Sequence, residues 1–177
     1  MLYSLNISQM LPDDLALVYS ITRDAYSLNF SHHWEDGGLP IYLEDVFGEK
    51  VLKSELNNPS IQYYIAFVDE YPAGFMKLHL YSNLPGLDPQ MGIELEKLYV
   101  LPDYKGVGIG QQFLSLAFRV AKDLKKEILW LAVLDKNEPA IAFYEKAGFR
   151  RHSATQVQYA KFKIEYMGMW RMAMKIQ

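Results

Sequence analysis

The chain has 177 residues, of which 50% are hydrophobic, and a formal net charge of −3 from 18 basic and 21 acidic side chains. This length and composition predict a single folded domain over residues 1–177 with a substantial core, and they exclude a disordered chain. No run of Lys and Arg is longer than two residues, so we expect no nucleic-acid partner.

The sequence contains no cysteine, which excludes disulfides, thiolate metal sites and cysteine nucleophiles. Its longest apolar run, residues 128–134, is far shorter than the ~20 residues that a membrane helix needs. The N-terminus has no basic segment followed by an apolar one, so no signal peptide is expected. We therefore expect a cytoplasmic protein with no membrane partner. No metal site is expected either.

Hydrophobic periodicity and turn residues divide the chain into strands and helices. The predicted elements are an edge strand over 2–8, helices over 12–27 and 40–56 on either side of a loop over 29–40, strands over 61–68 and 73–81, a loop over 82–90, a central strand beginning near Met91, a helix over 109–124, a strand over 128–134, a short helix capped by Asn137 and ended by Gly148, and strands over 149–160 and 163–175. This order predicts an α/β protein with a mixed sheet flanked by helices.

The central strand contains an irregularity that has chemical consequences. Ile93 and Leu95 alternate with Glu94 and Glu96, as expected for a strand with one apolar face. Near Lys97 the alternation shifts by one residue, so that the next apolar side chains fall on the face of the glutamates. A one-residue shift predicts a β-bulge, which leaves backbone groups unpaired beside two carboxylates.

Three alternate glycines, Gly106, Gly108 and Gly110, then open the helix over 109–124. Glycines at a helix N-terminus let backbone N–H groups approach an anion, and the helix dipole adds positive potential there. A Walker loop is excluded because Gln111 follows the last glycine, and a Rossmann fingerprint is excluded because Phe113 stands where a further glycine is required. The turn therefore predicts a site for a phosphate-bearing cofactor of another kind.

Two segments together resemble the GNAT superfamily of acyl-CoA-dependent N-acyltransferases. The segment from Lys105 to Gly110 is similar to the pyrophosphate loop of that family, with Lys105 where Gln or Arg is usual. The segment from Asn137 to Phe149 is similar to the second hallmark of the family. The resemblance covers residues 60–150 most strongly, and the N-terminal helices and the tail also resemble PaiA-type and related polyamine acetyltransferases.

This resemblance implies the GNAT fold, with a mixed, mostly antiparallel central sheet flanked by helices. It also implies an N-acetyltransferase that uses acetyl-CoA as cosubstrate and acetylates a primary amine, a small amine or a polyamine, by direct attack. Two alternatives remain open on the sequence. One is an enzyme of the same fold acting on a protein N-terminus or lysine, and the other is a non-catalytic CoA-binding regulatory module.

The resemblance and the two motifs together assign a role to each part of the cofactor site. Amides from Val107 to Gly110 would hold the pyrophosphate, and backbone groups of residues 98–100, freed by the bulge, would pair with the pantetheine arm. Asn137 would contact the same arm. The expected cofactor-binding residues are Leu98, Tyr99, Val100, Lys105, Gly106, Val107, Gly108, Ile109, Gly110, Gln111 and Asn137.

Two residues are expected to act on protons. An amine is protonated at neutral pH, so a base must deprotonate it. Glu96 is the first candidate because it lies closest to the bulge, and Glu94 on the same face is the second. The resemblance implies that Tyr144 donates a proton to the departing thiolate. Whether residues 32–34 (His-His-Trp) line the acceptor pocket is open, and the apolar final strand makes a homodimer conceivable.

Overall fold

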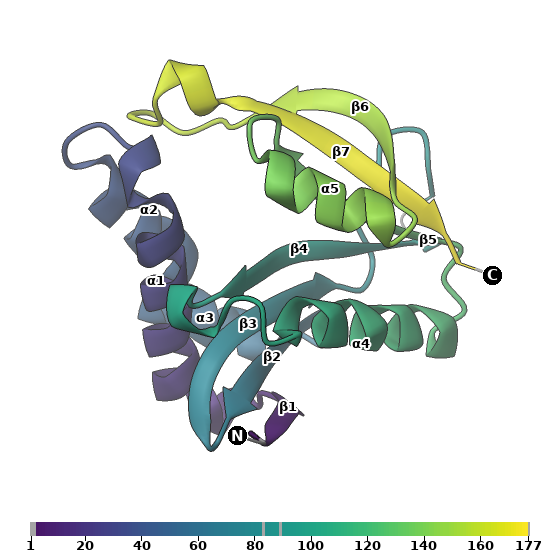
Figure 1. Ribbon diagram of the computed structural model, residues 1–177, viewed down its shortest axis with the longest axis horizontal. Coiled ribbons are helices and arrows are strands. Elements are labelled where there is room, and N and C mark those ends of the chain that lie inside the picture. Colours follow the sequence, from purple (N-terminus) through teal and green to yellow (C-terminus); the bar gives the residue numbers. More distant parts are fainter. Residues whose placement is uncertain (1–2, 83, 89, 177) are drawn as a thin grey trace.

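The computed structural model describes residues 3–82, 84–88 and 90–176 (Figure 1). The strands are β1 (Leu5–Gln9), β2 (Ile61–Val68), β3 (Tyr71–His79), β4 (Gly92–Val100), β5 (Ile128–Leu134), β6 (Arg150–Gln156) and β7 (Gly168–Lys175). Within the described residues these seven strands form one sheet in the order β1-β2-β3-β4-β5-β7-β6. All neighbouring strands are antiparallel except β4 and β5, which are parallel. The predicted mixed, mostly antiparallel sheet is confirmed.

Five helices flank the sheet in the described part of the chain (Figure 1). They are α1 (Leu15–Phe30), α2 (Gly38–Phe47), α3 (Glu49–Leu56), α4 (Ile109–Asp123) and α5 (Glu138–Lys146). The helices α1, α2 and α3 pack against one face of the sheet, and α4 and α5 pack against the other. Among the described residues, no helix combines the length and the apolar character needed to cross a membrane.

Each face of the sheet has its own hydrophobic core because successive strand residues point to opposite faces. In β2, Tyr63 and Ile65 belong to the core under α1, α2 and α3, whereas Tyr64 and Ala66 belong to the core under α4 and α5. Strands β2 and β3 lie between these two apolar cores, so most of their residues are buried. The site described below opens between the two layers of helices.

The helix predicted over 40–56 is two helices that meet at Gly48. The amide of Gly48 ends α2 by donating to the Glu44 carbonyl oxygen, at 3.1 Å, and its own carbonyl accepts from the Leu52 amide, at 3.0 Å. Gly48 has an extended ψ of 151°, and a Cβ built there would lie 2.3 Å from the Glu44 carbonyl oxygen. The apolar stripe continues across the break, which is why periodicity alone predicted a single helix.

The strand predicted over 163–175 begins only at Gly168, and Tyr166 lies outside it in a short 3-10 turn. Residues 157–167, which we call the tail loop, leave the sheet and cross to the helices α1 and α2. The Glu35 amide donates to the Lys161 carbonyl at 2.8 Å, and Phe162 forms an isolated β-bridge with Trp34. The aromatic side chains of the tail loop therefore join the core of the N-terminal helices rather than the edge of the sheet.

Candidate active site

Strands β4 and β5 pair at one end and separate at the other. They are in register only from Gly92 opposite Ile128 to Glu94 opposite Trp130. Beyond this point β4 continues to pair with β3, and β5 continues to pair with β7, so that the facing edges of β4 and β5 diverge (Figure 1). A cavity of about 840 Å³ opens at this divergence and is lined by residues of both strands.

The predicted bulge in β4 lies where the two strands separate. Lys77 of β3 pairs with Lys97, but the next residue, Leu78, pairs with Leu95, so Glu96 is the extra residue. A bulge bends and twists the strand that contains it, which is consistent with β4 turning away from β5 here. The predicted bulge is confirmed.

The free backbone edge of β4 has a different origin from the one that the sequence indicated. Leu98, Tyr99 and Val100 remain paired with Met76, Phe75 and Gly74 of β3 on one side. On the other side no strand in the described part of the chain pairs with them, because β5 has turned away. The free edge of β4 therefore results from the separation of β4 and β5, and all three residues line the cavity.

The glycine turn leads from β4 into α4. Gly106 and Gly108 have φ values of 84° and 90°, which other residues rarely adopt, and a Cβ at either position would meet no atom within 4 Å. These glycines therefore leave open space beside the backbone. Gly110 differs, because a Cβ there would lie 3.2 Å from the ring of Phe143 in α5. Gly110 thus allows α4 and α5 to pack closely.

The N-terminus of α4 supplies an anion-binding site at this turn. The amides of its first turn have no acceptor inside the helix, and the helix dipole places partial positive charge beside them. Ile109, Gly110 and Gln111 line the cavity with Lys105, Gly106 and Gly108. Val107 does not line it, and its carbonyl accepts a hydrogen bond from the Tyr3 hydroxyl at 2.9 Å. The turn fits the pyrophosphate of a nucleotide cofactor.

Asn29 of α1 is a cavity residue that sequence reasoning missed. Its Oδ1 accepts a hydrogen bond from the Lys105 Nζ at 2.7 Å, and its Nδ2 donates to the Val100 carbonyl at 3.1 Å. One amide side chain therefore links α1, the end of β4 and the glycine turn. No sequence signal pointed to it, because these segments are distant in the chain and meet only through the fold.

Asn137 and Tyr144 approach the cavity from α5. The Oδ1 of Asn137 accepts from the Ala140 amide at 3.3 Å and so caps the helix, as predicted. Tyr144 is buried, with its ring centroid 5.7 Å from that of Phe149. Burial raises the pKa of the Tyr144 hydroxyl, which is therefore protonated at neutral pH. Both side chains line the cavity.

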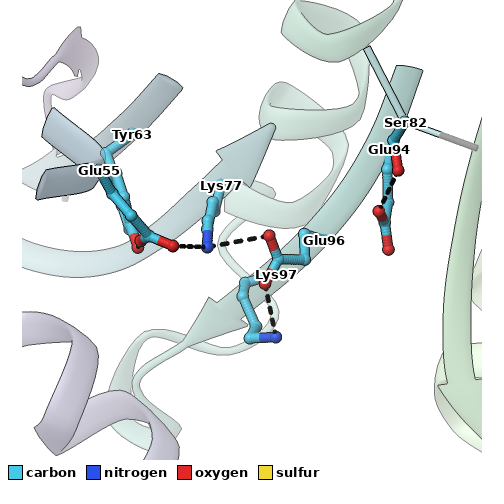
Figure 2. Close-up of polar contacts among 7 residues, drawn as sticks. All are labelled: Glu55, Tyr63, Lys77, Ser82, Glu94, Glu96 and Lys97. Atoms are coloured by element: carbon cyan, nitrogen blue, oxygen red, sulfur yellow. Dashed lines mark hydrogen bonds and ion pairs between the residues drawn. The ribbon is translucent and has the colours of Figure 1, made fainter. Parts of the chain in front are cut away.

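Glu96 lies between two lysines on the other side of the cavity (Figure 2). Its carboxylate oxygens are 2.9 Å from the Nζ of Lys77 and 3.1 Å from the Nζ of Lys97. Burial raises the pKa of Glu96, but the two ammonium groups outweigh burial and lower the pKa to about 2. Glu96 is therefore ionised over the whole physiological pH range.

Glu94 has the opposite character, although it was predicted on the same face. Its carboxylate accepts a hydrogen bond from the Ser82 hydroxyl at 2.6 Å, and no lysine of the described residues forms an ion pair with it (Figure 2). Burial raises the pKa of Glu94, and the hydrogen bond from Ser82 offsets only part of this effect. The cavity thus contains one strongly acidic carboxyl group and one weakly acidic one.

Aromatic rings wall one part of the cavity, which we call the aromatic end. Its rings come from α1, α2, β4 and the tail loop: Tyr26, Phe30, Tyr42, Tyr99, Tyr159 and Phe162. Trp34 lies behind this wall, with its ring centroid 5.0 Å from that of Tyr42, and neither it nor His32 or His33 lines the cavity. The rings of Tyr159 and Phe162 were not predicted at the cavity, because residues 157–160 were expected to belong to a strand.

Comparison with known proteins identifies the class of site. The model of the acetyltransferase (GNAT) family matches residues 17–149. This chain belongs to that family. It is therefore an N-acetyltransferase, and acetyl-CoA is its cosubstrate.

Individual relatives agree with this assignment. An uncharacterised N-acetyltransferase of Lactobacillus delbrueckii subsp. lactis is 29% identical over 148 residues, which cover 83% of this chain and 85% of the relative. The spermidine N(1)-acetyltransferase of Thermoplasma acidophilum is 26% identical over 83% of this chain and 89% of its own length. The crystal structure of the PaiA N-acetyltransferase from T. acidophilum in complex with coenzyme A superposes with a TM-score of 0.76, over 97% of this chain and 99% of that one, at 20% identity.

Proposed function

We propose that this acetyltransferase transfers the acetyl group of acetyl-CoA to the primary amine of a small molecule by direct attack of the amine. The observation that carries the proposal is that one cavity is lined both by the glycine turn with the free edge of β4 and by Glu94, Glu96 and the aromatic end. A cosubstrate and an acceptor can therefore meet in one cavity. Polyamines are among the candidate acceptors, because one relative is named a spermidine N(1)-acetyltransferase.

We call the part of the cavity lined by the glycine turn, the edge of β4 and Asn137 the cofactor end, and its residues fit coenzyme A. Amides from Gly108 to Gln111 would hold the pyrophosphate, and the Lys105 ammonium would add a point charge at the same phosphates. The edge of β4 from Leu98 to Val100 would pair with the amides of the pantetheine arm as an added strand does. Asn137, at the end of β5, would contact the arm from the opposite side.

The two carboxylates, Glu94 and Glu96, have different proposed tasks: one accepts the proton of the amine, and the other attracts the amine. The amine must lose a proton before or as its nitrogen forms the new amide bond. A base is most effective when its pKa lies near the working pH, which favours Glu94, whose pKa is raised. Glu96, with a pKa of about 2, is a weaker proton acceptor but a permanent negative charge that attracts the ammonium form of the substrate.

Tyr144 is the proposed proton donor to the leaving sulfur. As the C–S bond breaks, the sulfur acquires negative charge and takes the phenolic proton. The raised pKa of Tyr144 keeps this proton in place until it is needed. No acceptor among the described residues binds the hydroxyl, so it is available to a ligand in the cavity.

The direct test follows release of the CoA thiol when the purified protein is mixed with acetyl-CoA and a panel of monoamines, polyamines, amino acids and short peptides. We expect turnover with at least one small amine. In the variant Tyr144→Phe, we expect kcat to fall by roughly 10²-fold, the scale of a lost general acid, with unchanged binding of CoA in calorimetry. Absence of both turnover and CoA binding in the wild type contradicts the proposed function, and unchanged turnover in the variant removes Tyr144 from it.

A further inference from the structure

Lys97 is a charged residue of the cavity to which the proposed reaction gives no role. The bulge at Glu96 sets Glu96 and Lys97 opposite the single residue Lys77, so that both side chains lie on one face of β4 (Figure 2). The Lys97 side chain is only 15% exposed, and it lines the cavity. The predicted shift of alternation near Lys97 was the sequence signal that two successive side chains share this face.

Lys97 ends a chain of four charges and is the least compensated of them (Figure 2). Lys77 contacts two carboxylates, Glu55 at 2.6 Å and Glu96 at 2.9 Å. Glu96 in turn contacts two ammonium groups. Among the residues that the structure describes, Lys97 forms an ion pair only with Glu96, at 3.1 Å, and shares that carboxylate with Lys77. An ammonium has three donors, and two of those on Lys97 have no acceptor among the described residues.

The surroundings of Lys97 are rich in hydrogen-bond donors. Tyr42, Tyr99 and Tyr159 line the same end of the cavity and act electrostatically on Lys97. Burial lowers the pKa of Lys97, but Tyr42, Glu96 and Tyr99 outweigh burial and hold the pKa well above its usual value. The side chain is therefore an ammonium at neutral pH. A partly unpaired ammonium among hydroxyl groups in a half-buried cavity is a site for an anion.

We propose that Lys97, with the hydroxyls of Tyr42 and Tyr159, binds a carboxylate of the acceptor, so that the preferred substrate is an amine that also carries a carboxylate. This inference rests on the proposed function and narrows its substrate class to amino acids and ω-amino acids. The ammonium end of such a zwitterion would face Glu94 and the carboxylate end would face Lys97, with the carbon chain spanning the cavity between these two residues.

The charge balance of the cavity favours this class over polyamines. The chain of Glu55, Lys77, Glu96 and Lys97 sums to zero, and a zwitterion leaves this sum unchanged. A diamine brings two positive charges into a partly buried space in which Glu96 already faces two lysines, so that only Glu94 is left to offset one of them. Uncompensated charge is costly at low dielectric, so the diamine is the poorer acceptor.

The test compares acceptors that have the same reacting amine and carbon chain but differ in the far end: pentylamine, 1,5-diaminopentane and 5-aminopentanoate. Homologues with three to six carbons are included so that chain length does not decide the outcome. For the wild-type enzyme we expect kcat/KM to be at least tenfold higher for the amino acid than for the monoamine, and lowest for the diamine. In Lys97→Met we expect the preference to vanish, chiefly through a higher KM for the amino acids.

Lys97→Arg is the matched control, because it keeps the charge and we expect it to keep the preference. Calorimetry with CoA on each variant shows that the fold and the cofactor end are intact. Turnover of all three acceptors without preference, preference for the diamine, or an equal loss for all acceptors in Lys97→Met overturns this inference while the proposed function stands. Absence of turnover with every amine refutes the proposed function, and this inference falls with it.

Discussion

At the scale of single residues, the feature that determines the chemistry of the site is the contrast between Glu94 and Glu96. The two carboxyls are two positions apart on one strand. Glu94 accepts a hydrogen bond from Ser82, whereas Glu96 forms ion pairs with Lys77 and Lys97. Burial raises the pKa of Glu94, and for Glu96 the ion pairs outweigh the same effect. The surroundings of the two carboxyls, and not the residue type, therefore distinguish Glu94, the proposed proton acceptor, from Glu96, a permanent negative charge.

This contrast predicts the pH dependence of activity. A base with a raised pKa is protonated and inactive below that pKa, so kcat/KM of the wild type rises with pH through the raised pKa of Glu94. We expect Glu94→Gln to lower kcat/KM by roughly 10²-fold and to remove this acid limb, as loss of a general base does. Steady-state kinetics from pH 5 to pH 9 with a fixed amine is the measurement.

Glu96→Gln is the matched comparison for that experiment. Because the pKa of Glu96 is about 2, its charge does not change between pH 5 and pH 9. We expect this variant to lose activity but to keep the acid limb, shifted to lower pH because the charge of Glu96 no longer raises the pKa of Glu94. An acid limb that survives in Glu94→Gln and disappears in Glu96→Gln would reverse the two roles.

At the scale of secondary structure, the separation of β4 from β5 and the glycine turn after β4 build the cofactor end. Gly108 combines a φ of 90° with open space around its missing Cβ. Gly86 has nearly the same φ, 88°, and equally open space, but it lies outside the cavity. Alanine variants of Gly108 and Gly86 therefore distinguish the effect of backbone strain from the effect of filling the cofactor site.

We expect Gly108→Ala to weaken CoA binding at least tenfold, because the methyl group enters the space beside the first amides of α4. Gly86→Ala should cost similar folding stability, about 1 kcal/mol for a residue forced to positive φ, without changing CoA binding. Thermal unfolding and calorimetry with CoA on both variants measure the two effects. Equal CoA affinity in the two variants would contradict the assignment of the glycine turn.

Local patterns predicted most of these elements, and where they failed the cause was non-local. The bulge was visible because Leu95 and Leu98 cannot face the same core in a regular strand. The separation of β4 from β5 was not predictable, because pairing of strands about 35 positions apart depends on the whole sheet. The break at Gly48 was missed because the apolar stripe runs through it, and the path of the tail loop because its rings pack on Trp34 and Tyr42.

At the scale of the whole molecule, the sheet carries two independent cores, and the cavity lies where β4 and β5 separate between them. The helices α4 and α5 supply the cofactor end, whereas α1, α2 and the tail loop supply the aromatic end. Asn29 joins the two by binding both Lys105 and Val100. The proposed cofactor site could be predicted from the sequence because its residues are nearly contiguous, whereas the aromatic end could not, because its residues come from α1, α2, β4 and the tail loop.

The central claim is that the space between β4 and β5 holds acetyl-CoA, and a crystal structure of the protein with CoA tests it most directly. We expect the pyrophosphate at the amides of residues 108–111 and the pantetheine arm along the edge of β4 from Leu98 to Val100. We also expect the sulfur to lie within hydrogen-bonding reach of the Tyr144 hydroxyl. CoA bound elsewhere, or a β5 that closes onto β4 and pairs with residues 98–100, would contradict the account.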